Sequence, residues 1–184
     1  MEELKNKTLT YEVKKHLATL YKGGLPEYTK EVNIVSWNHL VPKIDIRRWE
    51  NNYPRKGVTL DGTEAETLFQ ALRVIFDNKE DRPRNNPDLN GCMVEDGDRI
   101  AYRIDENLAI LSTSNQGYTK EVNLMSWNHG NTKIDIRSWS PERRCTKGIT
   151  LDVPEAKMLY DVLVDFYGGP TIDPEDVPDF EANE

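Results

Sequence analysis

The chain has 184 residues, 37% of them hydrophobic, and its 24 lysines and arginines are outnumbered by 32 aspartates and glutamates, giving a formal net charge of -8. This length can support a sizeable hydrophobic core. The sequence contains no apolar run long enough to cross a bilayer and no cationic leader with a cleavage site, so we predict a cytoplasmic protein, nucleoid-associated if bacterial. Cys92 and Cys145 lack a metal-like spacing and are expected to be free thiols.

One segment of the chain occurs twice. Residues 28–39 read YTKEVNIVSWNH, and residues 118–129 read YTKEVNLMSWNH. The similarity continues on both sides of this segment, and a match over such a distance indicates an internal duplication. We therefore divide the chain into a first repeat at 9–78, a linker at 79–98, a second repeat at 99–169 and an acidic tail at 170–184.

Four strands are predicted in each repeat. Alternating apolar, β-branched and aromatic residues, separated by Gly, Pro and Asn turns, indicate them. In the first repeat they are expected at 11–21, 29–37, 43–49 and 57–60. The second repeat matches these segments and is expected to form the same strands.

A helix is predicted after the fourth strand. Asp61 and Glu64 have the spacing of a capping box, and Asp152 and Glu155 repeat it. Apolar residues then recur at helical spacing in both repeats, up to Asp77 in the first and up to the glycines at 168–169 in the second. Residues 79–98, rich in Pro, Asn and Gly, are interpreted as the linker between the repeats.

The expected fold class is α+β, with two ββββα repeats. One sheet face and one helix leave much apolar surface uncovered in each repeat. The simplest way to bury it is to pack the two helices together, which gives an intramolecular pseudo-two-fold dimer, like a symmetric dimer whose subunits have been fused.

The tryptophans are predicted to share a sheet face with cations. Because successive strand side chains point to opposite faces, Lys43, Arg47 and Trp49 lie on the face opposite Ile44 and Ile46. Flat aromatic rings interleaved with cations are what a surface for single-stranded nucleic acid requires. The alternative, that these strand tryptophans belong to the core, is the commoner case in general, but the face assignment favours stacking. Asp45 and Asp135 are interpreted as ion-pair partners of Arg47 and Arg137.

Several of these segments together resemble a known family. Ser36-Trp37-Asn38, KIDIR at 43–47, Trp49 and KGVTL at 56–60 before a helix, with their second copies, resemble the transcriptional coactivator family of positive cofactor four. They are most similar to its bacterial YdbC-like branch. The resemblance implies a curved four-stranded antiparallel sheet with a C-terminal helix, dimerisation, and binding of single-stranded DNA across the sheets. It also implies that this chain contains its own dimer partner.

The function predicted is binding of single-stranded DNA with low sequence preference, in transcription, replication, recombination or repair. Both sheet regions are basic although the whole chain is acidic: residues 28–60 and 118–151 each contain six lysines and arginines against three acidic residues. Local potential governs phosphate contacts. The expected nucleic-acid-binding residues are Lys30, Asn33, Trp37, Lys43, Arg47, Trp49, Arg55, Lys56, Lys120, Asn123, Trp127, Lys133, Arg137, Trp139, Arg144 and Lys147.

Other functions remain open at this stage. Single-stranded RNA is the nearest alternative, and a protein-interaction module that binds an acidic partner is another. His39 and His129 recur without a nucleophile, a paired acid or a metal-like spacing, so we expect no enzyme activity, cofactor or metal. The acidic tail is interpreted as an inert solvated end, with two alternatives: it competes with nucleic acid for the basic sheets, or it recruits a partner through Phe180. Whether two chains pair further is also left open.

Overall fold

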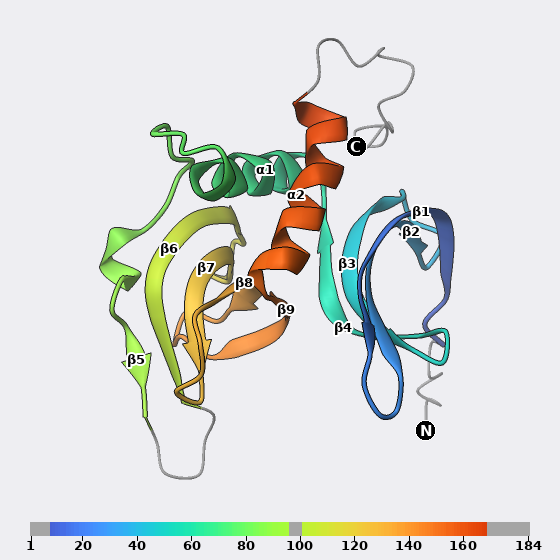
Figure 1. Cartoon of the computed structure of the whole chain (residues 1–184), viewed down its shortest axis with the longest axis horizontal. Helices are drawn as coiled ribbons and strands as arrows, with labels where there is room; N and C mark the ends of the chain where they lie inside the picture. The colour runs from blue at the N-terminus through green and yellow to red at the C-terminus, as the bar shows by residue number, and fades with distance from the viewer. Residues whose placement is uncertain (1–7, 96–100, 169–184) are drawn as a thin grey trace.

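The computed structural model describes residues 8–95 and 101–168, and within them the fold is α+β with two antiparallel sheets and two α-helices (Figure 1). The first sheet has the order β1 (Tyr11–Gly23), β2 (Tyr28–Trp37), β3 (Lys43–Glu50) and β4 (Tyr53–Leu60), and it is followed by α1 (Gly62–Phe76). The second has the order β5 (Met93–Val94), β6 (Tyr102–Thr113), β7 (Thr119–Trp127), β8 (Lys133–Trp139) and β9 (Cys145–Leu151), and it is followed by α2 (Val153–Tyr167).

The predicted order of four strands and a helix is therefore present in both halves, with two differences in detail. The linker region contains two elements that were not predicted, a 3₁₀ turn at Pro87–Leu89 and the short strand β5, which pairs with Arg103 and Tyr102 of β6. In addition, β4 begins at Tyr53 and not at Gly57, because Pro54 still pairs with Trp49 of β3. Proline is tolerated there since β4 is an edge strand of the sheet.

Both helices begin at the predicted capping boxes. The Asp61 carboxylate accepts a hydrogen bond from the backbone N–H of Glu64 at 2.8 Å, and the Glu64 carboxylate accepts one from the N–H of Asp61 at 3.0 Å. Asp152 and Glu155 make the same reciprocal pair at 3.0 and 2.9 Å. These bonds satisfy backbone N–H groups that the first turn of a helix otherwise leaves without a partner. This explains why each helix begins directly after the fourth strand of its repeat.

One apolar core joins the two halves. It contains Val32 and Ile46 of the first sheet, Val122 and Ile136 of the second, and apolar residues of both helices. The helices cross over between the sheets: α1 contacts β6 of the second sheet, and α2 contacts β1 of the first. Strands β4 and β9 lie beside each other where the halves meet (Figure 1). Each half thus buries apolar surface of the other.

Aromatic residues dominate the contact between the helices. The Phe69 ring of α1 stacks on Tyr160 and Tyr167 of α2, with ring centres 5.9 and 5.7 Å apart. The Tyr160 hydroxyl donates a hydrogen bond to Asp77, the C-terminal capping residue of α1. Burial, together with the neighbouring Asp77 charge, raises the pKa of Tyr160 to about 12. Neither helix, nor any other described helix, has the length and apolarity needed to span a membrane.

Candidate nucleic-acid interface

The side of each sheet that faces away from the helices is organised by one buried carboxylate. In the first sheet this is Asp45, which accepts hydrogen bonds from Arg47 Nε at 2.6 Å and Nη2 at 2.7 Å, from Trp37 Nε1 at 3.1 Å and from Thr59 Oγ1 at 2.8 Å. Four donors compensate the loss of water around this fully buried charge. The predicted ion pair between Asp45 and Arg47 is confirmed.

The second sheet repeats this network. Asp135 accepts from Arg137 at 2.6 and 2.8 Å, from Trp127 Nε1 at 3.3 Å and from Thr150 Oγ1 at 2.7 Å. Its predicted ion pair with Arg137 is likewise confirmed. The carboxylate therefore fixes the orientation of an indole and a guanidinium in both halves.

The guanidinium of each pair lies over the indole ring. The Arg47 guanidinium lies 4.5 Å from the ring centre of Trp37, and the Arg137 guanidinium lies 4.6 Å from that of Trp127. Both arginines were predicted to be available to phosphates. Instead they are mostly buried, and each is matched by a buried carboxylate. Their role in this structure is to hold the indole in place by hydrogen bonding and cation–π contact.

Two glycines make the close approach of these strands possible. A Cβ on Gly57 would lie 2.1 Å from Arg47 Cβ and 2.4 Å from the carbonyl oxygen of Ile46. A Cβ on Gly148 would meet Arg137 Cβ at the same distance. Since no side chain fits there, glycine lets β4 and β9 pack directly against the arginines of the two networks.

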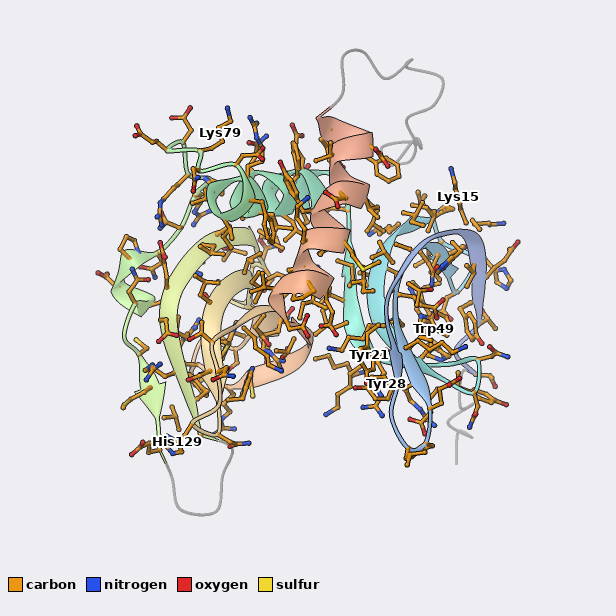
Figure 2. The ribbon with its side chains drawn as sticks, in the orientation of Figure 1. Lys15, Tyr21, Tyr28, Trp49, Lys79 and His129 are labelled. Carbon is orange, nitrogen blue, oxygen red and sulfur yellow. The ribbon has the colours of Figure 1, made fainter. Side chains whose placement is uncertain are left out.

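The four tryptophans do not have equal access to solvent. Trp37 and Trp127 are partly exposed, whereas Trp49 is 6% and Trp139 0% exposed. The expectation that all four rings face outward is wrong for Trp49 and Trp139. Trp49 lies within the bend of the first sheet against Tyr11, with ring centres 5.5 Å apart (Figure 2). The pairing of β3 with β4 shifts register between Arg47 and Trp49, and such bulges bend a sheet. Alternation along β3 therefore predicted the side of the sheet on which Trp49 lies, but not how much of its ring is exposed to solvent.

Lys30 and Lys120 form contacts between the two halves. Lys30 Nζ reaches across to the second half, where it donates to Glu155 at 3.0 Å and to the carbonyl oxygen of Thr150 at 2.9 Å. Lys120 Nζ makes the reciprocal contacts with Glu64 and the carbonyl of Thr59, each at 2.9 Å. These two lysines join the halves, and the prediction that they face a nucleic acid does not fit their positions.

The two predicted asparagines lie inside the sheets. Asn33 is buried, with its Oδ1 2.7 Å from His16 Nδ1. Asn123 is buried as well, and its Oδ1 accepts a hydrogen bond from Asn107 Nδ2 at 2.7 Å. Neither side chain is presented to a ligand.

The remaining predicted residues lie at the surface. Lys43 is partly exposed, and Lys133 and Arg144 are exposed on the second half. Arg55, Lys56 and Lys147 come together in a groove of about 520 Å³. The groove is lined by Leu9, Trp37, Arg47, Arg48, Glu50, Pro54, Arg55, Lys56 and Lys147.

This groove brings together an aromatic ring and several cations that lie far apart in the sequence. Five cationic side chains line it against the single carboxylate of Glu50, and the partly exposed Trp37 ring lies among them. Lys147 belongs to the second repeat and reaches the groove because β9 lies beside β4. Arg48 was not predicted as a site residue, although a second arginine directly after Arg47 could have indicated a further phosphate contact. It lies 3.8 Å from the centre of the Tyr28 ring.

Two other expectations concern residues away from this groove. His39 and His129 lie in exposed turns with φ of 62° and 61°. In the described parts of the chain, no three His, Cys, Asp or Glu side chains are grouped as a metal site would need. The acidic tail at 170–184 lies outside the described residues.

No family model matches the chain. An uncharacterized protein of Treponema pallidum (strain Nichols) is 40% identical to it over 67 residues, which make up 36% of this chain and 79% of that protein. The matched length is close to that of one repeat, so the relative has room for one such unit and not for two. The identity and the coverage of the relative are both high, and this chain therefore belongs to the same family as the Treponema pallidum protein.

Proposed function

We propose that this chain is a single-stranded DNA-binding protein of low sequence specificity, acting in transcription, replication, recombination or repair. The observation that carries the proposal is the groove of about 520 Å³ in which Trp37 lies among five cations. A base stacks on the exposed part of the indole, and the flexible cations at the rim hold the neighbouring phosphates. Nothing in this arrangement reads base edges, so little sequence preference is expected.

The fixed position of Trp37 supports this role. Its N–H is held by Asp45 and its ring is backed by Arg47, so the indole is ordered before a ligand arrives. A ring that is already held in place loses little side-chain entropy on binding. The buried carboxylate also cancels the charge of Arg47, which leaves Arg48, Arg55, Lys56 and Lys147 to attract phosphates.

We further propose that the two repeats form an intramolecular pseudo-two-fold dimer. Reciprocal contacts support it: Lys30 binds Glu155 and Lys120 binds Glu64, while each helix contacts the first long strand of the other sheet. Reciprocity of this kind is what a two-fold interface requires. The length of the relative supports it too, because a protein with one repeat would need a second copy to cover the same apolar surface.

A titration with three nucleic acids tests the proposed function. Fluorescein-labelled oligo-dT, oligo-rU and a mixed duplex are titrated at two salt concentrations by anisotropy. We expect oligo-dT to bind more tightly than duplex, with log K falling by about 0.7 per phosphate contact for each unit of log salt. Equal or tighter binding of oligo-rU would assign the protein to RNA, and binding of poly-glutamate in place of all three would favour an acidic protein partner.

Replacing Trp37 tests the stacking surface directly. We expect Trp37→Ala to weaken oligo-dT binding by about 1–3 kcal/mol, the usual contribution of one stacked base, while the circular dichroism spectrum stays unchanged. Trp49→Ala is the contrasting variant: because Trp49 is buried, it should lower the melting temperature of the protein. If Trp37→Ala binds as tightly as the unmodified chain, the ring is not a stacking platform.

A further inference from the structure

We propose that the two repeats do not share the nucleic acid equally, and that the first repeat provides the principal binding surface. The inference rests on the proposed function and assigns its site to one half of the chain. The duplication allows a direct comparison, because the strand pairings align the two sheets residue by residue.

Three of the positions that differ between the aligned sheets lie next to Lys30 or Arg47 of the first repeat. Lys30 is flanked across the sheet by Tyr21 and Arg48, whereas the corresponding Lys120 is flanked by Ser112 and Ser138. The third position is occupied by Arg55 and Thr146, whose carbonyl oxygens accept the equivalent hydrogen bonds from Arg47 and Arg137. At all three positions the first repeat has an aromatic ring or a guanidinium where the second has a small hydroxyl side chain.

Two of these three residues, Arg48 and Arg55, belong to the groove of the first repeat. The neighbouring Tyr21 and Tyr28 (Figure 2) have ring centres 5.1 Å apart. The Arg48 guanidinium lies 3.8 Å from the centre of the Tyr28 ring. Arg48 and Arg55 line the groove beside Trp37, and their side chains are 42% and 52% exposed. Both lie near the same carboxylate, Glu50, at 3.5 and 3.8 Å, so two cations share one negative charge. The first repeat therefore has two exposed cations in the groove beside Trp37 at positions where the second repeat has Ser138 and Thr146.

The second repeat uses the same region for its own packing. Arg143 is held by Glu121 at 2.5 and 3.1 Å, and its guanidinium lies 4.6 Å from the centre of the buried Trp139 ring. Tyr102, which pairs with Val94 of β5, is 8% exposed, compared with 38% for the aligned Tyr11. Tyr102 and Arg143 therefore pack within the second repeat and are not available to a nucleic-acid strand.

Two variants of equal net charge test this asymmetry. The double variant Arg48→Ser/Arg55→Thr gives the first repeat the residues of the second. Lys133→Ser/Arg144→Ser removes two exposed cations from the second repeat and serves as the matched control. Affinity for oligo-dT is measured by anisotropy over a series of salt concentrations, and circular dichroism verifies that both variants fold.

We expect the first variant to lose about 10-fold or more in affinity and to reduce the salt slope by about 1.4, as for two lost phosphate contacts, while the control changes less than about 2-fold. Adding cations to the second repeat through Ser138→Arg/Thr146→Arg in the first variant should restore part of the loss. Equal losses in both variants, or a larger loss in the control, would overturn the inference and leave the proposed function standing. Failure of the unmodified chain to bind oligo-dT would overturn both.

Discussion

At the scale of single residues, two buried carboxylates determine what each sheet presents to solvent. Asp45 and Asp135 have no exposed surface, yet each binds an arginine and an indole N–H. A buried charge is tolerated only when it is fully paired, so the sequence must supply these partners together. This requirement explains why the Asp-x-Arg pattern and its tryptophan occur as a unit in both repeats.

Glu64 shows how one side chain can serve two purposes. It completes the capping box of α1 and also accepts hydrogen bonds from Ser112 and Lys120 of the second half, at 2.7 and 2.9 Å. Burial raises the pKa of Glu64, but the hydrogen bond from Ser112 and the charge and hydrogen bond of Lys120 outweigh it, so the pKa lies below its ordinary value of 4.5. The ionised form is therefore favoured by folding.

The pH dependence of stability follows from this shift. A carboxyl whose pKa is lower in the folded state stabilises the protein above its unfolded pKa, and this contribution is lost as the pH falls through the folded pKa. We predict that Glu64→Gln lowers the free energy of unfolding at pH 7 by about 1–3 kcal/mol and flattens its decline in acid below pH 4.5. Urea unfolding at pH 7, 5, 4 and 3 measures both effects. Glu66→Gln, an exposed position on the same helix, is the control, and an equal effect there would contradict the prediction.

At the scale of elements, the bend of each sheet depends on irregular strand pairing. The register of β1 with β2 shifts three times, as does that of β6 with β7, and β3 shifts against β4 between Arg47 and Trp49. Each shift adds local twist and redirects the following side chains. Glycine is needed at the same place, since Gly57 faces the Arg47 backbone without room for a Cβ.

A substitution at this glycine tests the role of the close approach. We predict that Gly57→Ala destabilises the fold by about 1–3 kcal/mol, because the new methyl group forces β4 away from β3. The displaced strand would also misplace Arg47 and hence Trp37. Thermal unfolding measures the first effect and tryptophan fluorescence the second. Gly130→Ala, where a Cβ would meet only the Trp127 carbonyl at 3.1 Å, should have a smaller effect, and the reverse order would be inconsistent with this explanation.

At the scale of the whole molecule, the two halves are parts of one core. Apolar residues of both sheets and both helices form a single cluster, and polar contacts from Lys30 and Lys120 reinforce it in both directions. Each helix packs in part against a strand of the other half. The groove has the same origin, since Lys147 of the second repeat contributes to the surface of the first.

Unfolding should therefore be one cooperative process. We predict a single calorimetric transition for the intact chain. Removing the ring of Phe69, which stacks on two tyrosines of the other repeat, should lower the stability of the whole molecule by about 3–5 kcal/mol. Differential scanning calorimetry of Phe69→Ala provides the measurement. Two separate transitions, with only one shifted by the substitution, would show that the halves are independent.

The sequence alone was sufficient for the duplication, for the order of four strands and one α-helix within each repeat, for both capping boxes and for the Asp–Arg ion pairs. All of these depend on residues close together in the chain or on direct comparison of two segments. Periodicity also separated the two sides of each sheet correctly, since Ile44 and Ile46 lie in the core and Asp45 lies on the other side. Local patterns are read reliably because alternation and capping need only neighbouring residues.

Only the tertiary structure decided which side chains of the predicted site meet solvent. Trp49 is buried because the sheet bends around it, Lys30 is neutralised by a glutamate 125 positions away, and Lys147 reaches the groove of the other repeat. Exposure and long-range pairing depend on how bent sheets pack together. That packing brings distant residues into contact, and the spacing of residues along one strand carries no information about it.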